Sequence, residues 1–170
     1  MNSNLLFDFS VNKENNTIHI QREFDAGLEL VWKAWTTAEL LDQWWGPEPW
    51  RAETKTMDFR EGGSWLYAMV GPQGERHWSK AHYITIEKEK LFTQRDGFCD
   101  ENGVMNAELP ENIMENHFRP KGDKAQVDMI LIFDDLADLE KTLETGFREG
   151  ITTDFEQLDA LLPVWKSQAG

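Results

Sequence analysis

Apolar and polar residues alternate with a period of two near the start of the chain. Ile18, Ile20 and Phe24 are separated by polar residues at 19, 21 and 23. Successive side chains of a strand point to opposite faces, so this pattern predicts a strand with one dry face. It is the first expected element, and residues 1–15 are expected to form an extension that precedes the folded domain.

The pattern then changes to helical spacing. Leu28, Val31, Trp32 and Trp35 recur three to four residues apart, which predicts a short helix. Thr36 with Glu39 has the spacing of a capping box and predicts the start of a second short helix. That helix carries Leu40, Leu41 and Trp44.

Strand patterns return after residue 50, interrupted by turn residues such as Gly62-Gly63 and Gly71-Pro72-Gln73-Gly74. We expect six further strands, joined mainly by hairpins, at residues 52–59, 64–70, 76–86, 91–98, 113–119 and 126–133. Residues 99–110 are polar and rich in turn residues, and are expected to form one long loop. Loops of this length in compact domains are often functional or mobile.

The last element is a long amphipathic helix at residues 136–162. Asp134 or Asp135 can cap it, its apolar residues keep a period near 3.6, and Pro163 is expected to end it. The chain is therefore expected to be α+β, with a curved antiparallel sheet of about six to seven strands around the long C-terminal helix. One domain is expected over residues 1–170, folded at 16–162 and followed by a tail at 163–170.

The segment from Trp44 to Trp50, with the sequence WWGPEPW, holds three of the eight tryptophans. Its prolines and glycine prevent the helix from continuing, so the indoles must gather at a junction. Trp44 and Trp45 are read either as a latch over the edge of the core or as the wall of a ligand cavity.

These motifs carry a resemblance to a known family. The WWGPEPW turn, the segment DFREGGSW at 58–65, the turn at 71–74 and GFREG at 146–150 resemble the SRPBCC superfamily. Within it, the chain resembles the family named after the C-terminal domain of the activator of the heat-shock protein 90 ATPase. The resemblance covers residues 17–162 and implies the helix-grip fold shared with the major birch pollen allergen and with lipid-transfer (START) domains.

The resemblance also implies a cavity between the sheet and the long helix. Alternation puts Trp65, Tyr67 and Met69 on one strand face, which the resemblance places toward the helix. Spacing of four puts Phe147 and Ile151 on one helix face, which would oppose them. Together with Trp44 and Trp45 they are the candidate ligand-binding residues, and ordinary core packing is the alternative reading. Members of the family commonly have a tryptophan near Ile151, so the shape of the cavity does not carry over.

Composition narrows the function further. Lys and Arg number 17 and Asp and Glu 31, so the formal charge of 17 − 31 = −14 opposes binding to nucleic acid or to an anionic membrane. The single cysteine, Cys99, allows no internal disulfide, and no signal peptide or membrane-spanning apolar run is present. A cytoplasmic protein is expected, without metal or cofactor.

Candidate catalytic pairs are few. His77 and His82 lie five apart in one expected strand and so point to opposite faces. Glu115 and His117 share a face, either as an acid–base couple inside a cavity or as a solvated surface pair. Cys99 is next to acidic residues that disfavour its thiolate.

Gly146 and Gly150 both fall within the expected last helix. Glycine lowers helix stability by about 1 kcal/mol relative to alanine, so two of them suggest the close approach of a neighbour, by packing or by a ligand. The charged residues around them exclude a membrane dimer face.

Three functions remain open. The first is a non-enzymatic module that binds an apolar or amphipathic small molecule in the cavity. The second is a chaperone-associated interaction module, which requires a solid core and an exposed contact surface, and the third is a cyclase- or hydrolase-type enzyme, which requires polar groups converging inside the cavity. The identity of the ligand, a chaperone partner and a homodimer stay open with them.

Overall fold

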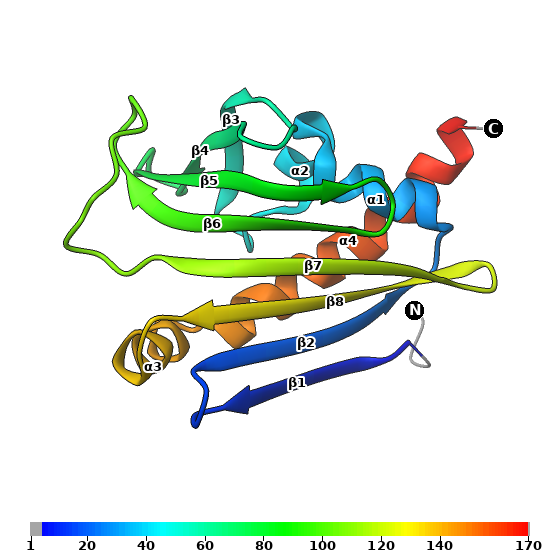
Figure 1. Cartoon of the computed structure of the whole chain (residues 1–170). Coiled ribbons are helices and arrows are strands. Elements are labelled where there is room, and N and C mark those ends of the chain that lie inside the picture. Colours follow the sequence, from blue (N-terminus) through cyan, green and yellow to red (C-terminus); the bar gives the residue numbers. More distant parts are fainter. Residues whose placement is uncertain (1–4, 170) are drawn as a thin grey trace.

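The structure, a computed structural model, describes residues 5–169, and over these residues eight strands form one antiparallel sheet with four helices (Figure 1). The strand order is β1-β2-β8-β7-β6-β5-β4-β3. The strands are β1 (Phe7–Asn12), β2 (Thr17–Phe24), β3 (Arg51–Met57), β4 (Ser64–Val70), β5 (Arg76–Glu87), β6 (Leu91–Cys99), β7 (Asn112–Lys121) and β8 (Lys124–Phe133). The expected α+β class and antiparallel sheet are confirmed.

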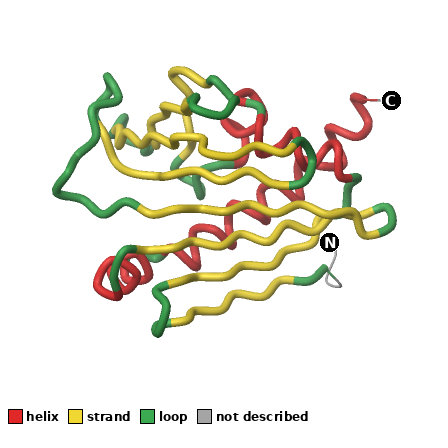
Figure 2. The backbone as a smooth tube through the Cα atoms, viewed as in Figure 1, coloured by secondary structure: helices red, strands yellow, loops and turns green. Residues whose placement is uncertain are grey.

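The helices lie together on one side of the sheet, and the longest of them passes diagonally behind the strands in Figure 2. They are α1 (Leu28–Thr36), α2 (Ala38–Trp44), α3 (Leu136–Glu144) and α4 (Phe147–Ala169). Aromatic side chains join the two layers: Phe24 of β2 lies 5.5 Å from Phe155 of α4, and Trp32 of α1 lies 4.9 Å from Phe118 of β7, between ring centroids. The sheet face that meets the helices is called the inner face below.

The two short helices occur where expected, but the second starts without the predicted capping box. Thr37 separates them, and its extended backbone starts α2 without a side-chain cap. Thr36 belongs to α1, where its hydroxyl donates to the carbonyl of Trp32 at 2.9 Å. The predicted capping box is therefore wrong, because this threonine bonds back along its own helix.

The first strand lies inside the segment expected to be an extension. In β1, Phe7 and Phe9 point to the inner face, where Phe7 lies 5.9 Å from Phe155 and Phe9 lies 6.2 Å from Phe147. The strand is short, and most of its residues are exposed at the sheet edge. Only the alternation of residues 7, 9 and 11 marks it in the sequence.

The expected long helix is two helices. Asp135 caps α3 by accepting a hydrogen bond from the backbone N–H of Asp138 at 2.9 Å, as predicted. Gly146 has φ of +86°, which is not a helical value, and it separates the end of α3 from the start of α4. Pro163 does not end α4, which continues because Leu162 and Trp165 are buried at 1% and 7% exposure on either side of it.

The long loop after β6 folds back onto the sheet. Cys99 pairs with Met105 in an isolated bridge, and Lys55 donates from Nζ to the carbonyl of Glu101 at 2.8 Å. Gly103 lies beside the side chain of Lys80, which points away from the inner face of β5. The loop therefore packs on the outer face and does not border the space between sheet and helices.

Candidate functional site

Three of the predicted aromatic residues meet on the inner face of β4. The rings of Trp65 and Tyr67 are stacked, with centroids 3.9 Å apart and planes at 19°. Trp45, from the turn after α2, donates from Nε1 to the hydroxyl oxygen of Tyr67 at 3.3 Å. Trp65 is buried, whereas Trp45 and Tyr67 keep part of their side chains accessible. The group is one aromatic wall with a buried and an accessible end.

The turn that contributes Trp45 is fixed to α4. The carboxylate of Asp154 accepts from the N–H of Gly46 at 3.1 Å, and Gln157 donates from Nε2 to the carbonyls of Trp44 and Gly46, both at 3.0 Å. Gly46 has φ of +115° and lies so close to Met69 that an added Cβ would be 2.8 Å from its sulfur. Met69 therefore packs directly beneath the turn, next to the aromatic wall.

Trp44 has a structural role in this turn. It is fully buried, donates from Nε1 to the carbonyl of Ala34 at 2.9 Å, and packs against Trp35 with centroids 4.7 Å apart. A buried indole whose N–H is satisfied anchors helices to each other. This geometry fits the latch reading for Trp44.

Phe147 lies apart from the aromatic wall, whereas Ile151 lies in the core. Phe147 packs against Phe9 of β1, at the opposite edge of the sheet order from β4, and no ring contact joins it to Trp65 or Tyr67 among residues 5–169. Ile151 is 2% exposed within the hydrophobic core. The structure thus brings Trp44, Trp45, Trp65, Tyr67 and Met69 together and places Phe147 elsewhere on α4.

A cavity of about 20 Å³ lies beside the aromatic wall. A space of this size holds about one water molecule, so the core is nearly filled. Of the predicted site residues, Trp45 and Trp65 line it. The complete lining is Trp35, Leu41, Trp45, Trp65, Tyr83, Phe92, Gln94, Met114 and Asn116.

Polar side chains on the inner faces of β6 and β7 form a strip through this apolar region. Gln94 lies opposite Tyr83 and Met114, and its Nε2 donates to Asp96 at 2.6 Å. Asn116 is fully buried with both amide atoms unpaired, and Nδ2 of Asn112 is also buried without a partner. The name polar strip is used below for these four residues: Gln94, Asp96, Asn112 and Asn116.

Two carboxyl groups in this region are weaker acids than usual. Burial raises the pKa of Asp96 to about 7, against a smaller lowering by the hydrogen bond from Gln94. Burial likewise raises the pKa of Asp154 to about 8, although the N–H of Gly46 opposes the shift. Burial and the charge of Asp96 also raise the pKa of Tyr67, which stays a neutral phenol. Strongly shifted groups beside a cavity mark a candidate functional site.

The sequence analysis did not identify the polar strip. Its members alternate with apolar residues, and such a pattern reads as a strand whose polar side faces water. The signal available in the sequence was the alternation within each strand. Gln94 and Asp96 share a face of β6 with Phe92, and Asn116 shares a face of β7 with Phe118. A large aromatic residue on the same strand face as an uncharged polar residue indicates that both point inward.

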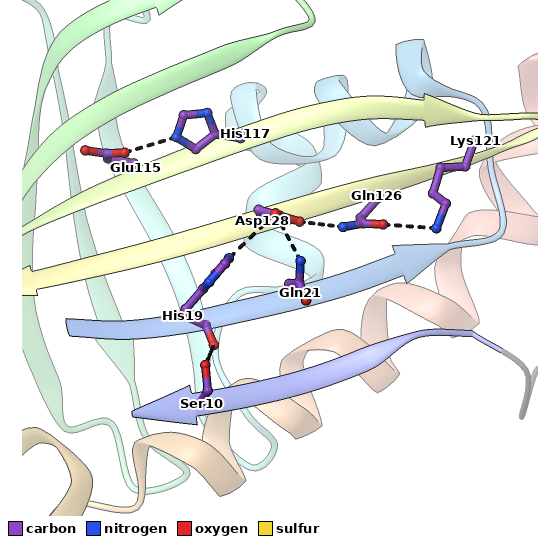
Figure 3. Close-up of polar contacts among 8 residues, drawn as sticks. All are labelled: Ser10, His19, Gln21, Glu115, His117, Lys121, Gln126 and Asp128. Atoms are coloured by element: carbon purple, nitrogen blue, oxygen red, sulfur yellow. Dashed lines mark hydrogen bonds and ion pairs between the residues drawn. The ribbon is translucent and has the colours of Figure 1, made fainter. Parts of the chain in front are cut away.

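The pair Glu115 and His117 lies on the outer face, as Figure 3 shows. His117 Nε2 is 3.0 Å from Glu115 Oε1, and their side chains are 42% and 33% exposed. This outcome matches the solvated-pair interpretation. The neighbouring polar residues belong to the same surface, where Gln126 donates to Asp128 at 2.7 Å and accepts from Lys121 at 3.1 Å.

His77, His82 and Cys99 do not come together to form a catalytic or metal-binding site. His77 pairs with Met69 on the inner face of β5, and His82 pairs with Ser64 on its outer face, so the predicted separation is confirmed. Burial, with a further contribution from Asp100, raises the pKa of the Cys99 thiol. Over residues 5–169 no cluster of three His, Cys, Asp or Glu side chains has metal-binding geometry. None of the described helices combines the length and apolarity needed to cross a membrane.

Comparisons with known proteins agree with this architecture. A protein from Arthrobacter aurescens, solved by NMR, is 31% identical, with 92% of this chain and 91% of that chain covered and a TM-score of 0.86. A crystal structure from Mycobacterium smegmatis is 26% identical over 93% and 96% of the two chains, with a TM-score of 0.84. A protein titled AHSA1 from Silicibacter pomeroyi shares the fold, at 23% identity over 87% and 98% of the chains and a TM-score of 0.69.

A search of curated proteins gave no match. The family described as "Activator of Hsp90 ATPase homolog 1-like protein" matches residues 25–163, from the end of β2 to Pro163 within α4. This range includes the WWGPEPW turn, the aromatic wall and the polar strip. The chain therefore belongs to the family of activator of Hsp90 ATPase homolog 1-like proteins.

Proposed function

We propose that the protein binds a small amphipathic molecule between the inner face of the sheet and α4. The observation that carries this proposal is the polar strip, because buried amides without partners are rare inside an apolar core and are costly to keep. A ligand that supplies hydrogen bonds to the strip and apolar area to the aromatic wall satisfies both. In this proposal the ligand lies against the aromatic wall of Trp45, Trp65 and Tyr67 and against the neighbouring Met69. Trp44 and Ile151 support the wall from the core, and Phe147 lies apart from it at the start of α4.

The accessible residues indicate where a ligand enters. Tyr67, Met69 and Asp96 are partly exposed, and Phe98, at the end of β6 on the same face, is 46% exposed. Exposure of inward-pointing side chains shows that this end of the sheet is incompletely covered. We expect a molecule larger than water to displace Trp45, which lines the cavity and is hydrogen-bonded to Tyr67.

The test is binding of N-phenyl-1-naphthylamine, a neutral apolar dye, followed by its fluorescence. Ser79 lies on the inner face of β5 between Tyr67 and Phe98, so Ser79→Trp should obstruct the entrance and weaken binding by about tenfold or more. Lys80→Trp adds the same indole to the outer face of the same strand and should leave binding unchanged. A wild-type protein that ignores the dye, or a Ser79→Trp variant that binds it normally, contradicts the proposal.

The nearly filled core favours a second candidate, an interaction module acting on a chaperone. A solid core was the expectation attached to that function, and the cavity is only about 20 Å³. The family description names an activator of the Hsp90 ATPase. Stimulation of ATP hydrolysis by a purified Hsp90, together with no dye binding, would favour this candidate over the ligand-binding one.

A further inference from the structure

Asn116 is the least satisfied polar residue of the described chain. Its side chain is 0% exposed, and neither Nδ2 nor Oδ1 has a hydrogen-bond partner. Its cross-strand neighbours on the inner face are Phe92 and Met129, which offer it no hydrogen bond. Asn116 also lines the cavity, so a partner for its unpaired amide could fit there.

The amide of Asn116 is available in a way that the neighbouring amide is not. Gln94 also lines the cavity, but its Nε2 donates to Asp96 at 2.6 Å. Asn116 therefore presents a donor and an acceptor side by side in one plane. The complementary group is one that carries an acceptor and a donor in the same arrangement.

The charge around the cavity selects a neutral partner. None of its nine lining residues is cationic or anionic. The nearby carboxyl groups are Asp96 on the inner face and Asp154 on α4. Of the basic side chains on the inner face, Arg22 is paired with Asp159 at 2.5 Å and His77 packs against Trp50. A ligand carboxylate would be desolvated with no cation to pair with it, which is strongly unfavourable.

We propose that Asn116 recognises the uncharged polar end of the ligand, a carboxamide or lactam, while the apolar body of the ligand lies along Trp45, Trp65 and Phe92. This inference rests on the proposed function and adds the chemical class of the ligand. A carboxamide forms two hydrogen bonds with the asparagine amide, one in each direction. A site built to satisfy a buried amide discriminates strongly against ligands that leave it unpaired.

The experiment compares three molecules that share one ten-carbon chain: decanamide, decan-1-ol and decanoate. Binding to the full-length protein at pH 7 is measured by calorimetry. Wild-type protein should bind decanamide at least about tenfold more tightly than decanoate, with decanol between them. Asn116→Leu, which keeps the branching at Cγ but removes both polar atoms, should reduce that preference to below about threefold.

The matched control is Glu115→Leu, because Glu115 is next to Asn116 in β7 but lies on the outer face, away from the cavity. This variant should retain the wild-type preference. Asn116→Val provides a second variant if Asn116→Leu fails to fold, and it should also lose decanamide affinity, since valine offers neither a donor nor an acceptor.

Two results would overturn the inference and leave the proposed function standing: equal affinity for the three head groups, or a decanamide preference that survives at Asn116→Leu. A crystal structure with decanamide bound and only a water molecule on Asn116 would do the same. If none of the three molecules binds and the dye also fails to bind, both the inference and the proposed function fall.

Discussion

At the scale of single residues, Asp96 and Asp154 give the protein an unusual dependence of stability on pH. Burial raises their pKa values to about 7 and about 8, so the folded state keeps protons that the unfolded state releases near pH 4. A group whose pKa is higher in the folded state stabilises fully only below its unfolded pKa. The free energy of unfolding should therefore fall as the pH rises from about 4 toward 8.

Asp154→Asn should remove much of this dependence. One retained proton contributes a slope of about 1.4 kcal/mol per pH unit, and the slope between pH 5 and 7 should flatten by about that amount. The amide oxygen of asparagine can still accept the bond from Gly46, so the turn should stay in place. Urea unfolding at several pH values measures the slope. Glu156→Gln, an exposed acid on the same helix, is the control and should keep the wild-type slope.

Sequence patterns located the aromatic residues of the site but not its polar ones. Trp65 and Tyr67 were found because alternation in a strand fixes which residues share a face. Asn116 and Asp96 were missed because a polar residue in a strand is ordinarily solvated, although each shares its strand face with a large aromatic residue, Phe118 or Phe92. The separation of Phe147 from Trp65 depends on where α4 crosses the sheet, which local spacing does not encode.

At the scale of the elements, the break between α3 and α4 explains one of the two neighbouring glycines. Gly146 has φ of +86°, a conformation that side chains with a Cβ rarely adopt, and it ends α3 as a helix-terminating glycine. Gly150 is inside α4, and a Cβ there would lie 3.6 Å from Pro47, an ordinary contact. The close approach that the sequence suggested is present at Gly150 but does not require glycine.

The two positions should respond in opposite directions to alanine. Gly146→Ala should destabilise the protein by about 1 kcal/mol, because it places a Cβ in the left-handed region. Gly150→Ala should be neutral or stabilise it by up to about 1 kcal/mol, because alanine is the better helix former. Chemical denaturation of both variants measures the two effects. Equal destabilisation would indicate that both glycines are needed for packing.

Helix ends were the least predictable part of the fold. Apolar spacing near 3.6 continues from Leu139 through Leu143 and Phe147 into α4, so the interruption of two residues left no mark on it. Pro163 was read as a stop because proline removes a helical hydrogen bond. Burial of Trp165 on the following turn offsets that loss, and this contact depends on tertiary structure.

At the scale of the whole molecule, the sheet is completed by a pairing between distant parts of the chain. Strands β3 to β8 pair as sequential neighbours, whereas β2 pairs with β8 and joins residues 17–24 to residues 125–132. The sequence indicated both of these strands but could not show their pairing. Beside it, Lys121 at the end of β7 forms an ion pair with Glu23 of β2 at 2.7 Å.

Charge is the other property of the whole molecule, and it predicts how salt should act. The formal charge of −14 leaves many carboxylates without a cation. Self-repulsion of this kind lowers stability and is screened by salt, while exposed ion pairs such as Arg60 with Asp58 add little because each is already solvated. Salt weakens both the repulsion and the ion pairs, and we expect the stabilisation from weaker repulsion to exceed the loss from weaker ion pairs.

Raising NaCl from 20 to 500 mM at pH 8 should increase the free energy of unfolding by about 1 kcal/mol, which corresponds to roughly 2–4 °C in Tm for a chain of this size. The control is the same titration near pH 4.6, the isoelectric point, where the net charge vanishes. There the increase should disappear, because no net repulsion remains to be screened. An equal increase at both pH values would instead indicate a general effect of salt on apolar burial, and a decrease at pH 8 would show that the surface ion pairs contribute more than the repulsion.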